Sequence, residues 1–262
     1  MPTDLVFYAA AIPAVILVGL SKGGFGGAFA LVGVPILALV VPPVKAAAIM
    51  LPILIVMDIA SLWAWRHFRD IKTLKYLIPG AILGLGIGWL SAASLNASII
   101  QLLLGAVAII FVARMVHQQF FAPAEKRGKP APHGLVKGTF WGTISGFTSF
   151  ISHAGGPPFQ IYTVPLKLDP KLFAGTSARF FALMNALKLG PYFALGQFDT
   201  SNLMTSAILL PLAPVATLTG AWIVRRMSPK VFYPFMYVFI TLTGLKLVAD
   251  GVVAVLHQAQ GL

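Results

Sequence analysis

Apolar stretches long enough to cross a membrane alternate with short basic segments along this chain. Residues 76–113 and 200–224 contain no charged side chain. A membrane-crossing helix needs about 20 mainly apolar residues, so each stretch predicts at least one crossing. The polar triplet 96–98 (Asn-Ala-Ser) indicates two helices joined by a turn within the first stretch. The other mainly apolar stretches are 5–21, 23–44, 46–65, 142–166, 174–195 and 231–256.

The composition supports the same conclusion. Of the 262 residues, 58% are hydrophobic and 10% are charged, against about a quarter charged in an average soluble domain. The formal net charge of +12 would suggest nucleic acid in a soluble protein. In a membrane protein, basic loops orient the helices. We therefore expect a multi-pass protein of the cell (inner) membrane, in contact with the lipid bilayer and with no nucleic-acid partner.

The two halves of the chain repeat one spacing pattern. Pro35 follows Gly26 by nine positions, and Pro165 follows Gly156 by nine. An alanine follows each next proline, Pro42 or Pro170, by four positions. Ordered matches in halves of nearly equal length predict a duplication. The predicted parts are a first transmembrane repeat (1–117), a basic cytoplasmic linker (118–136) and a second transmembrane repeat (137–262).

The positions of the basic residues favour an inverted repeat. If each glycine-rich segment were one ordinary crossing, the basic residues near 167–171 and 225–230 would lie opposite those at 66–75. If each segment is a broken hairpin, all these clusters lie inside. We therefore predict an all-α polytopic membrane protein of two inverted repeats, each a Gly/Pro-rich broken hairpin plus three transmembrane helices.

The breaks carry the candidate chemistry. Glycines at 23, 24, 26 and 27 free backbone N–H groups for a ligand, and Gly155-Gly156 before Pro157-Pro158 suits the start of a new helix. Two half-helix N-termini facing each other would attract an anion. Paired, interrupted apolar segments are also typical of transporter binding sites. The alternative is close packing, because Gly23–Gly27 also matches the small-xxx-small pattern of membrane helices.

Ionisable side chains inside the predicted spans are candidates for function, because placing each one at the bilayer centre costs at least about 2.5 kcal/mol. Lys22 lies at the first break, His153 at the second, and Lys188 in mid-helix. A neutral, hydrogen-bonded role for His153 is as compatible with the sequence as substrate contact or proton relay. For Asp58 we expect a structural pairing rather than a role in function. The predicted substrate-binding residues are Lys22, Gly23, Gly24, Gly26, Gly27, Ser152, His153, Gly155, Gly156, Gln160, Asn185 and Lys188. The hydrogen-bonding groups among them could equally join helices to one another.

The balance of buried charge favours an anion, because bases outnumber acids in the spans. The sequence has no Walker A motif and no nucleophile elbow, and it has no cysteine. No cluster has metal-ligand spacing. We therefore expect no ATP-driven motor, no catalytic residues, no metal and no cofactor.

Two motifs carry a resemblance to a known family. They are Lys22-Gly23-Gly24-Phe25-Gly26-Gly27 with Pro35 and Ala46, and Gly155-Gly156-Pro157-Pro158 with Pro165 and Gly175-Thr176. Together they resemble the sulfite exporter TauE/SafE family of permeases over essentially the whole chain. The resemblance implies a membrane permease for small sulfur-containing anions such as sulfite or organosulfonates. The residues themselves indicate only a small anion.

The sequence therefore predicts a secondary transporter for a small anion, working by alternating access, with a homo-oligomer also compatible. Two other functions remain open. One is a passive anion channel. The other is a membrane-embedded enzyme acting through His153.

Lys22 provides the first test. Substitution Lys22→Ala removes the positive charge at the first break, so we expect transport to be lost while the protein still inserts. Transport kinetics measured beside membrane-fraction abundance check this, and unchanged kinetics would contradict the placement of the site.

Overall fold

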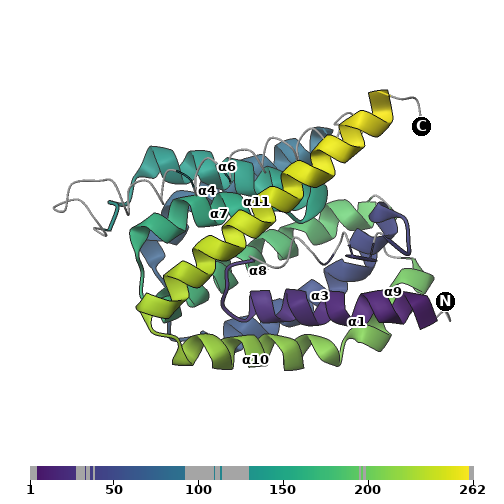
Figure 1. Cartoon of the computed structure of the whole chain (residues 1–262), viewed down its shortest axis with the longest axis horizontal. Coiled ribbons are helices and arrows are strands. Elements are labelled where there is room, and N and C mark those ends of the chain that lie inside the picture. The colour runs from purple at the N-terminus through teal and green to yellow at the C-terminus, as the bar shows by residue number, and fades with distance from the viewer. Residues whose placement is uncertain are drawn as a thin grey trace.

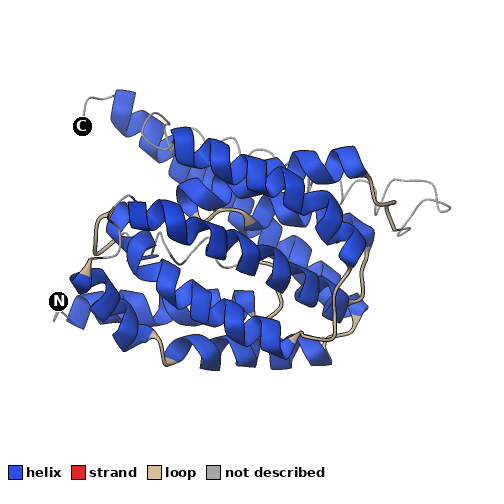
Figure 2. Ribbon diagram, turned by 180° about the vertical axis from the view of Figure 1, so that it is seen from behind, coloured by secondary structure: helices blue, strands red, loops and turns tan. Residues whose placement is uncertain are grey.

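The computed structural model consists of helices joined by turns (Figure 2). It describes residues 5–27, 33, 36–37, 39–91, 109, 113, 130–194, 196 and 199–259. Within these ranges no residue lies in a strand, which confirms the all-helical prediction for this part of the chain. The predicted turn at 96–98 and residues 118–129 of the predicted linker lie outside the described residues.

The helices follow the predicted stretches. In the first half they are α1 (Leu5–Lys22), α3 (Pro43–Ala64) and α4 (Ile71–Ser91). In the second half they are α6 (Leu135–Ser152), α7 (Gly156–Thr163), the short 3₁₀ helix η2 (Val164–Leu166), α8 (Pro170–Ala194), α9 (Thr200–Leu209), α10 (Leu212–Arg226) and α11 (Pro229–Ala259). The last two residues predicted as linker, 135 and 136, already belong to α6.

Polarity is distributed as expected of a membrane protein. In the described part, α1, α3 and α4 are long and apolar enough to cross a membrane, and α9 with α10, bent by 46°, would make a fourth span. Leu90 and Val136 expose 85% and 83% of their surface, whereas Lys188 is fully buried. Exposed apolar and buried charged side chains reverse the pattern of a soluble protein.

The basic segments lie at one end of the helices. The turns after α3, η2 and α10 and the residues before α6 lie at the left in Figure 1, whereas α1 begins and α11 ends at the right. The lysines and arginines of these segments are Arg66, Arg69, Lys72, Lys75, Lys137, Lys167, Lys171, Arg225, Arg226 and Lys230. Such one-sided placement follows the positive-inside rule.

Two helix pairs join the halves of the chain. Helix α4 packs along α6, and α1 packs along α10, while α3 lies against α8 between them. Glycines permit the close approach: a Cβ on Gly84 would overlap the carbonyl of Thr143, and one on Gly142 the carbonyl of Leu77. Close backbone contact through small residues is the usual packing of membrane helices.

The α4–α6 contact predicts opposite effects for two neighbouring glycines. Substitution Gly84→Ala forces α4 away from α6 and should destabilise the protein by about 1–3 kcal/mol. A Cβ on Gly86 would meet no atom within 4 Å, so Gly86→Ala should be neutral or stabilising by up to about 1 kcal/mol. Melting temperatures in one detergent compare the two, and an equal loss in both would contradict the packing.

Candidate functional site

The two breaks in the helices meet near the middle of the molecule. After α1 ends at Lys22, Gly26 and Gly27 take positive φ angles of 59° and 79°. After α6 ends, His153 also takes a positive φ, and α7 begins at Gly156. A Cβ on Gly156 would lie 2.7 Å from the carbonyl oxygen of Gly27. The absence of both side chains therefore lets the breaks touch.

Side chains from other helices bind the exposed carbonyl groups of the first break. Ser61 Oγ donates to the carbonyl oxygen of Lys22 (2.9 Å), and Trp65 Nε1 donates to that of Gly23 (2.7 Å). Gln160 Nε2 on α7 donates to the carbonyl oxygens of Phe25 (3.2 Å) and Gly26 (3.0 Å). An irregular backbone is tolerated in a membrane when protein groups satisfy it in this way.

Two hydroxyl groups of α6 do the same at the second break. Ser145 Oγ donates to the carbonyl oxygen of Gly155 (2.7 Å), and Thr148 Oγ1 lies 3.1 Å from that of Ala154. Both side chains are buried. Thr148 Oγ1 also lies 2.8 Å from the carbonyl oxygen of Ile144, so its single proton is shared. Each break therefore has side-chain donors that help to hold its non-helical backbone in place.

The N–H groups at the first break differ from the sequence expectation. Those of Gly23, Gly24 and Phe25 donate to carbonyl oxygens of Gly19 and Ser21, because the last turn of α1 continues past Lys22. They are therefore not open to a ligand.

The open donors lie where the breaks touch. Within the described residues, the N–H groups of Gly27 and Gly156 donate no hydrogen bond. In the first turn of α7, the two prolines after Gly156 have no N–H to offer. Of the glycines that line the cavity, one from each break thus offers its N–H group to a ligand.

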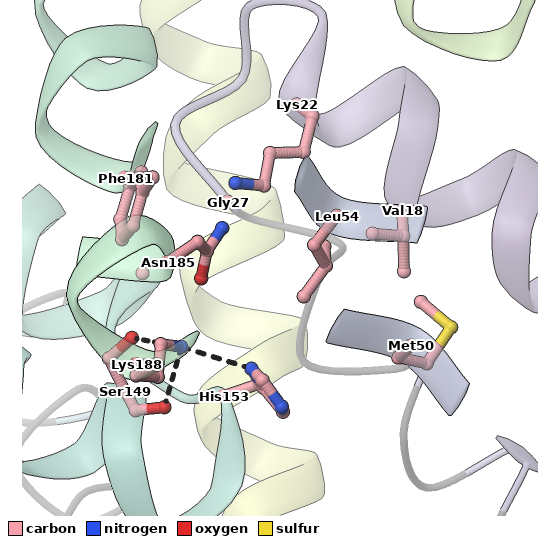
Figure 3. A pocket seen from close by; sticks show the side chains of 11 residues that line it. Val18, Lys22, Gly27, Met50, Leu54, Ser149, His153, Phe181, Asn185 and Lys188 are labelled. Atoms are coloured by element: carbon pink, nitrogen blue, oxygen red, sulfur yellow. Dashed lines mark hydrogen bonds between the residues drawn. The ribbon is translucent and has the colours of Figure 1, made fainter. Parts of the chain in front are cut away.

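A buried cavity of about 30 Å³ lies at this junction (Figure 3). Its lining combines charged, polar and apolar side chains from both halves of the chain. The lining residues are Val18, Lys22, Gly27, Met50, Leu54, Ser149, His153, Gly156, Phe181, Asn185 and Lys188. Six of the twelve predicted site residues are among them.

On one side of the cavity, Asp58 holds two polar groups of the lining. Lys22 Nζ lies 2.5 Å from Asp58 Oδ1, and Asn185 Nδ2 donates to Asp58 Oδ2 at 2.6 Å. Both oxygens of the carboxylate are thus occupied, and α1, α3 and α8 are joined. Lys22 also lies 5.5 Å from the centre of the Phe181 ring, within the range of a cation–π contact.

On the other side, Lys188 contacts only neutral groups. Its Nζ lies 3.0 Å from both the carbonyl oxygen and the Oγ of Ser149, and 3.1 Å from His153 Nδ1 (Figure 3). Three acceptors match the three N–H donors of an ammonium group. Nδ1 then accepts, so His153 carries its proton on Nε2, which faces the Tyr192 hydroxyl at 3.3 Å.

The remaining predicted site residues are not part of the cavity lining. Gly23 and Gly24 contact α10, and Gly26 packs against the Phe173 ring. Gly155 lies against Ser145 and Ser149, and Gln160 is bound to the first break. Ser152 ends α6, and the described structure does not include its side chain.

Sequence reasoning missed one polar residue of the site, Ser149, which contacts Lys188. The structural pairing expected of Asp58 is found, and its partners Lys22 and Asn185 both line the cavity. A lone acid within a span was the available signal for Asp58. Within the described residues, no group of three or more His, Asp or Glu side chains could hold a metal ion.

Comparison with known proteins identifies one family. A model of the family described as sulfite exporter TauE/SafE matches residues 11–247, which is most of the chain. The resemblance carried by the glycine motifs is therefore confirmed. No curated protein and no solved structure matches this chain.

The binding of the first break by Gln160 can be tested separately from transport. Substitution Gln160→Leu leaves the buried carbonyl groups of Phe25 and Gly26 without their side-chain donor, at a cost of about 1–3 kcal/mol. We expect a clear fall in melting temperature. Thr219→Val removes an exposed hydroxyl that bonds only within its own helix, and it serves as the control with little change. Equal melting temperatures for the two variants would contradict this role of Gln160.

Proposed function

We propose that this chain, which belongs to the sulfite exporter TauE/SafE family, is a secondary transporter. Its substrate would be a small sulfur-containing oxyanion, such as sulfite or an organosulfonate, moved across the inner membrane by alternating access. The observation that carries this proposal is the buried, positively charged cavity between the two helix breaks. Among the described residues that line it there are two lysines and no carboxylate.

The groups around the cavity suit an oxyanion. The partners of Lys188 are neutral, so the charge of its protonated side chain would be available to an anion. The N–H groups of Gly27 and Gly156 lack a protein acceptor in the described part of the chain. Gly156 also begins α7, where the helix dipole favours negative charge. A charged group and directional donors therefore line the same cavity.

The size of the cavity supports a conformational change during binding. A volume of about 30 Å³ holds roughly two waters, and a sulfur oxyanion is larger. We therefore expect the walls to separate when such an anion binds. The walls belong to both halves of the chain, so relative movement of the halves would open the site, as in the rocking of transporter repeats.

The helix packing supports two related halves. If α1 corresponds to α6 and α4 to the bent pair α9–α10, then the α1–α10 and α4–α6 contacts are equivalent. In the same correspondence α3 matches α8, so exchanging the two halves leaves the α3–α8 contact unchanged. This pairing, together with basic segments at one end (Figure 1), supports the inverted-repeat arrangement with those segments on the cytoplasmic side. The exposed apolar side chains would face the lipid bilayer.

Flux in proteoliposomes tests the function. Purified protein is reconstituted, and sulfite, sulfate, thiosulfate and methanesulfonate are offered in turn, with and without a pH gradient. Saturable flux of one anion that a gradient drives uphill would support the transporter. Flux that never runs uphill would indicate a channel, and conversion of the anion would indicate an enzyme. No flux of any of the four would reject the proposed substrate class.

Two lysines of α8 provide a matched pair of variants. Lys188→Gln removes the cavity's available charge, so kcat/KM for the transported anion should fall at least about tenfold, the effect expected for losing one charged hydrogen bond. Lys171→Gln changes a lysine at the basic end of the same helix, outside the cavity lining, and should keep near-normal kinetics. Similar losses in both would reject the site.

A further inference from the structure

We infer that Asp58 makes this site selective for singly charged anions, an inference that rests on the proposed function. Asp58 does not line the cavity. It acts through Lys22 and Asn185, both of which do. It is therefore a positioning residue that sets the charge a substrate meets.

The charge of the site follows from its contacts. Lys22 and Lys188 contribute two positive charges, from α1 and α8. Asp58, from α3, contributes one negative charge and is paired with Lys22. His153, the other titratable residue of the lining, accepts from Lys188 and is neutral. With Lys188 protonated, the site within the described structure carries one net positive charge.

One uncompensated positive charge matches one negative charge on the substrate. A monoanion beside Lys188 leaves a neutral buried site. A dianion leaves a net negative charge among buried side chains, where an unpaired charge is costly. Ionised Asp58 would also repel the second charge, because both contact the same small group of side chains. The cavity therefore favours a monoanion over a dianion of equal shape.

The hydrogen bonds of Asp58 add a geometric effect. A carboxylate only accepts, so the Asn185 amide must turn its nitrogen toward Asp58. The ammonium group of Lys22 is held by the same carboxylate. Asp58 thus keeps two strong donors of the lining occupied and leaves Lys188 as the group with free charge. Loss of its negative charge would release Lys22 to a substrate.

Methanesulfonate and sulfate are suitable probes, because both are tetrahedral sulfur oxyanions and they differ by one charge. The measured quantity is the ratio of kcat/KM for methanesulfonate to kcat/KM for sulfate in proteoliposomes. The unsubstituted protein should prefer methanesulfonate. Asp58→Asn keeps the shape of the side chain and removes its charge. It should move the ratio toward sulfate by at least about tenfold, since one added charge acts on the dianion more strongly than on the monoanion.

Two further variants separate charge selection from general damage. The double variant K22Q/D58N removes the ion pair and restores one net positive charge, so the ratio should return toward that of the unsubstituted protein even if flux is lower. Asp70→Asn changes a carboxylate paired with His133 at the basic end, outside the cavity. That variant should leave the ratio unchanged.

The outcomes distinguish this inference from the proposed function. If the unsubstituted protein transports sulfate in preference to methanesulfonate, the inference is overturned and the transporter proposal stands. The same holds if Asp58→Asn transports with an unaltered ratio, or if the double variant keeps the ratio of the single one. If Asp58→Asn does not fold, the ratio measured for the unsubstituted protein still tests the inference, because a preference for sulfate would overturn it. Failure to move either anion would count against the proposed function itself.

Discussion

The need to satisfy an interrupted backbone inside an apolar interior governs this structure. Each break exposes carbonyl groups that no helix can bond, and no water is available in a membrane interior to replace the missing partner. Ser61, Trp65 and Gln160 supply donors to the first break, and Ser145 and Thr148 supply them to the second. These contacts join segments far apart in the sequence, so the breaks, the helix packing and the cavity depend on one another.

The same constraint explains why charge is available at the site. Neutral side chains bind the carbonyl groups of the breaks, so the lysines are not needed there. Lys22 is paired with Asp58, and Lys188 contacts Ser149 and His153. One ion pair and one uncompensated ammonium group therefore face each other across a small cavity. A buried charge of this kind is costly without a ligand, and an anion would relieve that cost.

Glycine has two roles here that a sequence pattern does not separate. Gly27 and Gly156 line the cavity, and the absence of their side chains lets the breaks touch. Gly23 and Gly24 instead allow close helix packing, because they lie against α10. Both kinds of glycine occur within one short run. Which of them faces a ligand depends on where a helix distant in sequence is placed.

The sequence by itself determined the helical membrane class, the two breaks, the sidedness of the basic segments and the three ionisable residues Lys22, His153 and Lys188. Those features follow from apolar length, glycine and proline, and charge, which are local properties of the chain. Only the tertiary structure decided that Asp58 neutralises Lys22 while Lys188 stays without a carboxylate, and that Gln160 binds the opposite break. Pairings of this kind join residues more than thirty positions apart, and such contacts depend on how helices pack rather than on their own composition.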